Sequence, residues 1–139
     1  MASSSNLNKL QHVQNLLAVT VMMTNRPEHI MPPELYWLPV TARIKFKLAL
    51  LTLKILTSHQ PSYLRELLQP HRPSRQLRSS SHNLLDIPQT RTVFAQRSFS
   101  HCAPRIWNSL PDTITCDLNI TTCTFKRTLK TFVFSYCYS

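Results

Sequence analysis

One uninterrupted stretch, residues 41–57, most restricts the folds that this chain can adopt. It contains neither Gly nor Pro and reads T-A-R-I-K-F-K-L-A-L-L-T-L-K-I-L-T. At the roughly 3.6-residue period of an α-helix, its apolar side chains fall on two sides, whereas Arg43, Lys47 and Lys54 share one narrow seam. The alternation from Ile44 to Leu50 would also suit a half-buried strand, but the stretch exceeds the roughly three to ten residues of a usual strand. We therefore predict a central helix that is covered on two sides and exposes its cations.

Four further segments have helical patterns and could pack against the central helix. In the first of them an apolar stripe is expected to face the central helix, with Asn6 as the N-terminal cap. In the third, Trp107 is predicted to be buried against the central helix near Leu48 or Leu51. The four expected ranges are Leu7 to about Met23, Ser62 to Leu68, Ser98 to Leu110 with a bend or restart at Pro104, and Thr121 or Thr122 to about Ser135.

The remaining segments suggest loops and one small hairpin. Two short runs, Leu84 to Ile87 and Thr90 to Phe94, flank a Pro-Gln pair and could form a β-hairpin. The chain has ten prolines and no glycine, so backbone positions with positive φ are expected to fall to Asn83 or Asn108. The predicted fold is a mainly α, loop-rich small domain of four to five helices, with residues 1–139 forming a single module.

The motifs of most enzyme classes are absent. The six acidic residues are scattered, so no carboxylate pair for acid–base or metal chemistry can be identified. Without glycine there is no phosphate-binding loop, dinucleotide fingerprint or nucleophile elbow. The four cysteines form no C-x-x-C pair, and adjacent His101 and Cys102 would point in different directions on a helix. We therefore expect no catalytic residue, metal, cofactor or small-molecule substrate.

Targeting signals are weak. The run from Leu16 to Met23 is short, and no small-residue cleavage site follows it. Lys54 interrupts the other long apolar run, and nothing approaches the roughly 18 apolar residues of a membrane span. The expected location is the nucleus or cytoplasm, without secretion or membrane insertion.

The charge of the chain favours a polyanionic partner. Sixteen Lys and Arg residues face six acids, giving a formal net charge of +10. A loop over residues 70–83 is rich in Ser and Arg, and Arg forms the planar, two-pronged contacts that suit phosphate. The residues expected to contact an RNA or DNA backbone are Arg43, Lys47, Arg72, Arg75, Arg78, Lys126, Arg127 and Lys130.

Several short strings, in a fixed order, resemble a known family. That family is the LINE-type non-LTR retrotransposon polyprotein, and the similar part is the C-terminal region that follows the reverse transcriptase catalytic core. The resemblance covers nearly the whole chain. The strings are H-V-Q-N at 12–15, W-L-P-V at 37–40, R-I-K-F-K at 43–47, P-S-Y-L at 61–64, P-S-R-Q-L-R-S-S at 73–80, A-P-R-I-W-N-S-L-P at 103–111 and F-K-R-T-L-K-T at 125–131.

The resemblance implies a non-catalytic remnant of an enzyme that copies RNA into DNA. The family's aromatic-x-Asp-Asp catalytic motif has no counterpart here, and its members usually carry glycine where this chain has Ser58, Asn83 and Ala95. Two functions follow as expectations. The first is binding of a nucleic-acid backbone by Arg and Lys, and the alternative is a structural remnant that packs on the absent polymerase core and has no independent activity.

Overall fold

A computed structural model of the chain describes residues 3–22, 37–72 and 83–138. Within these ranges there are six α-helices and one 3-10 turn, and no β-strand, which confirms a small, mainly helical domain. The elements are α1 (Ser4–Met22), α2 (Val40–Ser58), α3 (Ser62–Arg65), η3 (Ala95–Arg97), α4 (Phe99–Asn108), α5 (Asp112–Thr115) and α6 (Thr122–Tyr138).

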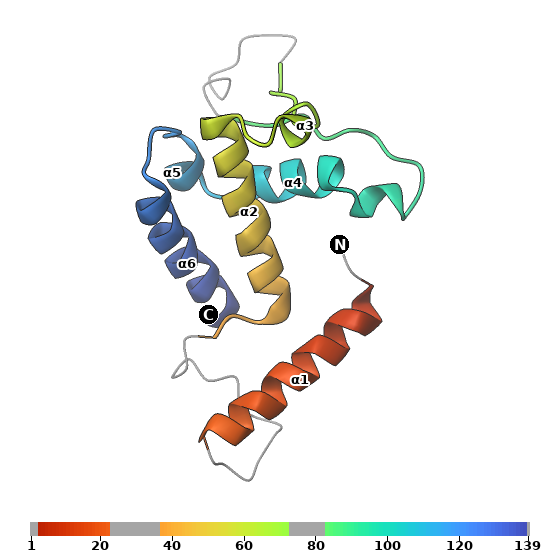
Figure 1. The fold of residues 1–139 in the computed structure, drawn as a ribbon, viewed down its shortest axis with the longest axis vertical. Coiled ribbons are helices and arrows are strands. Elements are labelled where there is room, and N and C mark those ends of the chain that lie inside the picture. The colour runs from red at the N-terminus through yellow and green to blue at the C-terminus, as the bar shows by residue number, and fades with distance from the viewer. Residues whose placement is uncertain (1–2, 23–36, 73–82, 139) are drawn as a thin grey trace.

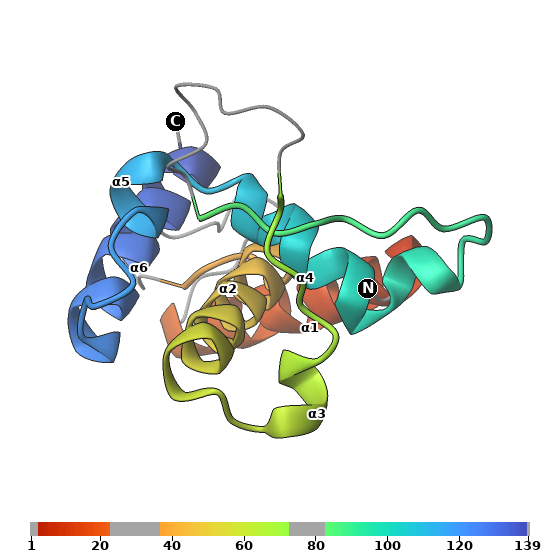
Figure 2. The same ribbon diagram turned by 90° about the horizontal axis from the view of Figure 1, so that it is seen from above.

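The predicted central helix is confirmed as α2, which packs against α1, α3, α4 and α6. Figures 1 and 2 show α2 and α6 side by side, with α4 crossing behind α2 and α1 set apart below. Helices α2 and α6 run in opposite directions. The Tyr138 hydroxyl at the end of α6 donates a 2.7 Å hydrogen bond to the Trp37 carbonyl just before α2, so the end of α6 lies beside the start of α2. This arrangement leaves one side of α2 open to solvent.

The core lies where α2, α4 and α6 meet. Leu53, Ile55, Trp107, Phe125 and Leu129 are each at most 1% exposed. The predicted burial of Trp107 is confirmed, and its ring stacks on Phe125 of α6 with centroids 6.2 Å apart. Helix α4 is continuous through the buried Pro104, whose missing N–H costs only one bond of the helix. The helix therefore does not restart at Pro104, and the alternative of a bend there stays a prediction.

The ends of two helices differ from those expected. At the end of α2 the left-handed position is occupied by His59, with φ 57°, and neither Asn83 nor Asn108 has positive φ, so that prediction was wrong. The His59 N–H donates a 3.0 Å bond to the Ile55 carbonyl, which satisfies a carbonyl in the last turn. By contrast α3 is a single turn, shorter than the predicted range.

The N-terminus of α6 agrees with its predicted cap. The Thr121 hydroxyl accepts a 3.3 Å bond from the Thr124 N–H, and the Thr121 carbonyl accepts a 3.0 Å bond from the Phe125 N–H. These contacts satisfy N–H groups that have no partner within the first turn. The helix then continues to Tyr138, beyond the expected end near Ser135.

Helix α1 meets α2 through polar contacts, and its apolar stripe is not covered. The Gln11 side chain accepts a 2.9 Å bond from the Val40 N–H, and the Gln14 side chain donates a 3.0 Å bond to the Leu38 carbonyl. Asn6 lies inside the helix, which begins at Ser4, so it is not the cap. Contrary to the prediction, most of the stripe is about half exposed: Leu10 53%, Val13 53%, Leu17 54% and Val21 60%.

The predicted hairpin over residues 84–94 is wrong. The first run forms an isolated bridge between Leu85 and Pro70, after α3, instead of pairing with the second run. The Asp86 N–H donates to the Gln69 carbonyl at 2.8 Å, and the His71 N–H donates to the Leu84 carbonyl at 2.9 Å. The backbone partner of residues 84–86 is therefore the segment after α3, and the second run leads into η3.

Candidate nucleic-acid interface

Helix α2 presents the predicted basic seam. Arg43 and Lys47 are exposed, and Lys54 is exposed on the same seam by the 3.6-residue period. Lys54 was not among the residues expected to contact a nucleic acid, although its spacing was already visible in the sequence. Lys45 lies elsewhere, with its Nζ atom 5.7 Å from the ring centroid of Tyr136 on α6.

Helix α6 has a second group of cations, Lys126, Arg127 and Lys130, which are all exposed. The opposite side of the helix is buried through Phe125, Leu129 and Val133. Helix α5 packs on one flank of α6, and Arg127 borders a shallow hollow of about 350 Å³ there. The lining residues of this hollow are Pro111, Thr113, Ile114, Arg127, Thr128, Thr131 and Phe132.

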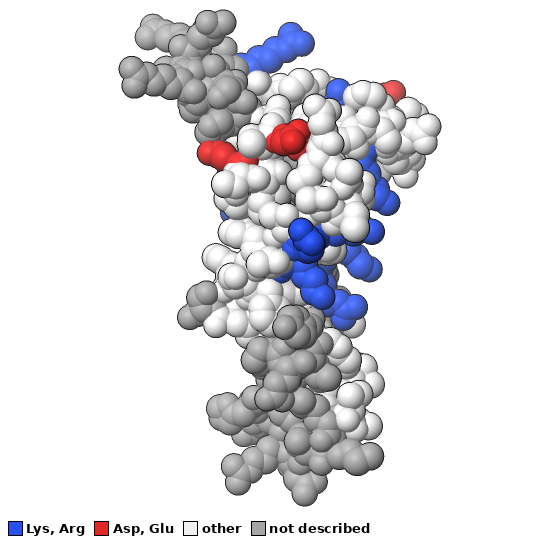
Figure 3. Space-filling model, turned by 90° about the vertical axis from the view of Figure 1, so that its left-hand side faces the viewer, with Lys and Arg blue, Asp and Glu red and all other residues white. Residues whose placement is uncertain are grey.

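We call the exposed cations of α2 and α6 together the basic face. These exposed cations lie on two helices, α2 and α6, that pack against each other. In Figure 3, Lys and Arg side chains gather along one edge of the visible face, and the acidic side chains lie above them. The basic face consists of Arg43, Lys47, Lys54, Lys126, Arg127 and Lys130.

Few carboxylates compete for these cations. Among the described residues the ion pair that the structure shows is His71 with Asp86, whose Nδ1 and Oδ1 atoms are 3.9 Å apart. Within that part of the chain no carboxylate pairs with Arg43, Lys47, Lys126 or Arg127. Arg43, Lys47, Lys126 and Arg127 can therefore meet an external anion without first breaking an ion pair with a described carboxylate.

The arginines of the 70–83 loop are not brought to this face by the described structure. Arg72 is exposed at the end of the described segment that follows α3. Arg75 and Arg78 lie outside the described residues. The loop therefore adds no defined geometry to the basic face.

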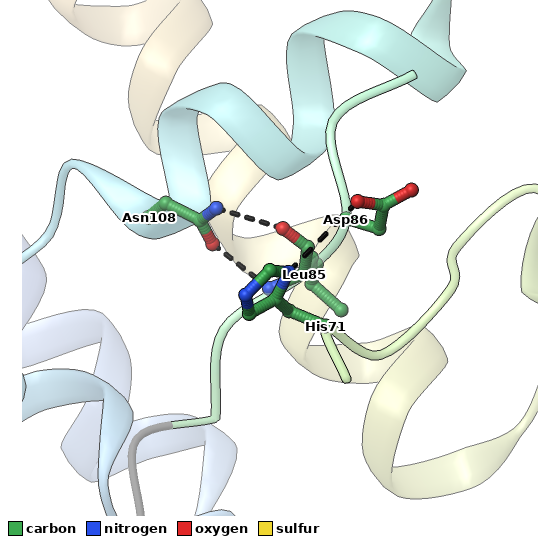
Figure 4. A network of polar contacts seen from close by, with 4 residues as sticks. All are labelled: His71, Leu85, Asp86 and Asn108. Atoms are coloured by element: carbon green, nitrogen blue, oxygen red, sulfur yellow. Dashed lines mark hydrogen bonds and ion pairs between the residues drawn. The ribbon is translucent and has the colours of Figure 1, made fainter. Parts of the chain in front are cut away.

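Polar side chains from the A-P-R-I-W-N-S-L string form hydrogen bonds to a backbone segment that is distant in the sequence, and we call these bonds the clamp. Asn108 accepts a 2.9 Å bond from the Leu85 N–H and donates a 2.8 Å bond to the Leu85 carbonyl (Figure 4). One amide side chain thus satisfies both backbone groups of a residue that is only 3% exposed. Sequence reasoning missed this role, since an Asn near the end of a helix does not indicate which segment it contacts.

Two more bonds extend the clamp on the same segment. The Trp107 Nε1 donates a 2.8 Å bond to the Asn83 carbonyl. The Asn83 side chain in turn donates 3.0 Å bonds to the carbonyls of Thr115 and Cys116. Asn83 was expected to provide positive φ, but its role is to join the loop to the end of α5. The string that contributes to the family resemblance therefore holds the fold together.

The cysteines show no catalytic or metal-binding arrangement in the described structure. None of the four forms a disulfide, and the buried Cys102 donates its thiol to the Gln96 carbonyl at 3.1 Å. Among the described residues, no group of three His, Cys, Asp or Glu side chains is placed to hold a metal ion. No helix in the same ranges combines the length and hydropathy required to cross a bilayer.

The chain was compared with protein families, curated proteins and solved structures. No family model, curated protein or solved structure matches this chain.

Proposed function

We propose that this chain is a non-catalytic module, derived from a retrotransposon reverse transcriptase, that binds the backbone of RNA or DNA through its basic face. The observation that carries the proposal is that two packed helices, α2 and α6, together expose six cations. Phosphates of a nucleic acid are regularly spaced anions, and cations fixed on helices match them without ordering a loop. The formal net charge of +10 adds long-range attraction for such a partner.

The resemblance to the region behind a reverse transcriptase core supports the same partner class. An enzyme that copies RNA into DNA must hold both nucleic acids, and a basic surface outside the catalytic core would contribute to that binding. The basic face offers no arrangement that reads individual bases. We therefore expect affinity for the backbone with little sequence preference.

The salt dependence of binding tests the proposal. If about five cations meet phosphates, the slope of log affinity against log salt concentration on single-stranded RNA is about −3 to −4. The measurement is fluorescence anisotropy of a labelled oligonucleotide over a range of salt concentrations. A slope near zero, or no binding at low salt, would end the proposal.

A matched pair of double variants separates the basic face from net charge alone. Arg43→Gln with Lys47→Gln should reduce the magnitude of the slope by about 1.4, because each phosphate contact contributes about 0.7. Lys9→Gln with Arg105→Gln removes the same charge from exposed positions on α1 and α4. The control pair should leave most of the slope intact. Equal losses for the two pairs would show that binding depends on net charge and has no defined face.

One observation favours a second candidate function, packing on the absent polymerase core. The apolar stripe of α1 is about half exposed, and its four large side chains lie on one face of the helix. A surface of this kind marks an interaction site in many proteins. If the missing core is required, thermal unfolding followed by circular dichroism should be broad and non-cooperative, whereas a sharp transition of a monomer would argue against this candidate.

A further inference from the structure

The turn between the Leu85 segment and α4, residues 91–97, presents an aromatic side chain to solvent. Phe94 is 86% exposed, the highest value among the large apolar residues that the structure identifies as exposed, and the adjacent Val93 is 65% exposed. Figures 1 and 2 both show the segment before α4 projecting from the helices on the side opposite α6. Phe94 therefore lies outside the core and outside the basic face.

Hydrogen bonds within the turn hold its backbone in place. The Gln96 N–H donates to the Thr92 carbonyl at 3.1 Å, and the Ala95 N–H donates to the Thr92 hydroxyl at 3.1 Å. The Arg97 N–H then donates to the Phe94 carbonyl at 3.0 Å. The Cys102 thiol ties Gln96 to α4. The turn thus fixes the position from which the ring extends, and a fixed group loses less entropy when it binds.

Two arginines flank Phe94 in the sequence, three residues before it and three residues after it. Arg91 and Arg97 are exposed at the two ends of the turn. An exposed aromatic ring on a turn that also carries cations matches a partner that carries anions and flat apolar faces close together. Single-stranded nucleic acid has both, because its unpaired bases leave their faces open next to the phosphates. A duplex keeps those faces stacked, except at its ends.

We propose that Phe94 is a stacking platform for an unpaired base, with Arg91 and Arg97 contacting the adjacent phosphates. This inference rests on the proposed backbone binding and narrows its ligand to single strands. The basic face would hold the backbone of either a duplex or a single strand, whereas the 91–97 turn would add affinity for single strands only. The chain would accordingly prefer single-stranded to double-stranded RNA at the same salt concentration.

The test compares variants of Phe94 on oligouridine of about 20 nucleotides, longer than the roughly 4 to 16 that one small module covers. Phe94→Ala and Phe94→Leu should both weaken binding by about 5- to 100-fold, and Phe94→Tyr should bind like the wild type. Val93→Ala is the matched control, since it removes an exposed apolar side chain without a π face, and it should stay within about twofold. The urea midpoint should not change, because Phe94 is outside the core.

A blunt-ended duplex of the same length completes the experiment. Phe94→Ala should bind the duplex within about twofold of the wild type. An equal loss on duplex and single strand, or full binding by Phe94→Leu, would overturn base stacking. If Phe94→Ala leaves both affinities unchanged but reduces self-association in sedimentation, the ring serves a protein contact and the inference is likewise overturned.

The two proposals fail in different ways. If the Arg43→Gln and Lys47→Gln double variant weakens binding to both ligands while Phe94→Ala weakens neither, only the stacking inference fails. If Phe94→Ala weakens single-strand binding while the double variant changes nothing, only the placement of the backbone site fails. A wild-type chain that binds neither oligouridine nor duplex at low salt refutes both.

Discussion

Replacing Trp107 by Ala is the most direct test of how this domain is held together. The side chain is fully buried, stacks on Phe125, and donates its Nε1 proton to the Asn83 carbonyl. Removing a buried Trp costs about 3 to 5 kcal/mol in unfolding free energy, and leaving a backbone carbonyl unpaired adds to that cost. A small domain has about 5 to 15 kcal/mol in total, so the variant would lose a large share of its stability.

Urea denaturation measures this loss directly. With a denaturant dependence of about 1.5 to 2 kcal/mol/M, a loss of 3 to 5 kcal/mol lowers the midpoint by about 1.5 to 3 M. Trp107→Phe keeps most of the apolar volume but removes the bond to Asn83, so its midpoint should fall by less. Trp37→Phe is a matched control, since this second Trp is only half-buried and precedes α2.

The result that would refute the reasoning is a Trp107→Ala midpoint close to that of the wild type. A change below about 0.5 M would mean that the ring does not fill the core, because a cavity of that size cannot be neutral in a packed interior. If RNA affinity fell at the same time with the midpoint unchanged, the ring would belong to a binding surface, and the core assignment would be wrong. Equal losses for Trp107→Phe and Trp37→Phe would show that the clamp bond adds no stability.

Three further outcomes are expected. Asn108→Ala should lower the unfolding free energy by about 1 to 3 kcal/mol, measured by urea denaturation, because both backbone groups of the buried Leu85 lose their partner; an unchanged midpoint would contradict the clamp. His59→Gly should raise the thermal midpoint, corresponding to at most about 1 to 2 kcal/mol, because glycine adopts positive φ without a Cβ clash; a lower midpoint would show that the 3.2 Å bond from the Arg65 Nε to the His59 Nδ1 outweighs the strain. Burial and the neighbouring Cys137 raise the pKa of Tyr138, so its stabilising effect is complete below the unfolded value near 10 and is lost as pH rises through the higher folded pKa; in a spectroscopic titration its phenolate should form at higher pH in the folded chain than in the urea-unfolded chain, and the opposite order would refute the burial.

The exposed stripe of α1 shows what the hydrophobic spacing can predict and what it cannot. The spacing of Leu10, Val13, Leu17 and Val21 correctly indicated a helix, since hydrogen bonds from residue to residue four positions apart are local. The same spacing was wrong about the partner of that face. The stripe is largely open to solvent because Gln11 and Gln14, on the adjacent face, bond to the backbone at the start of α2. Backbone groups without partners at a helix N-terminus readily bind polar side chains, and an apolar pattern does not show which side chains these will be.

The sequence by itself determined the helical class, the central helix, the cap of α6, the burial of Trp107 and the outward direction of the cations. All of these follow from local spacing and residue type. Where apolar and charged residues alternate at the helical period, the apolar positions show which face of the helix is buried. The exposure of Lys54 beside Arg43 and Lys47 could have been read from the same spacing. The hydrophobic period therefore predicted most of the basic face on α2 and α6.

Only the tertiary structure decided which distant groups meet. The bonds from Asn108 to Leu85 and from Trp107 to Asn83 join residues more than twenty positions apart, and many segments could have offered the same carbonyl or N–H. The chain has no glycine, and the left-handed position at the end of α2 is occupied by His59. Both choices depend on where the chain turns after each helix. That path is set by the packing of α2, α4 and α6 around one core, which no local pattern encodes.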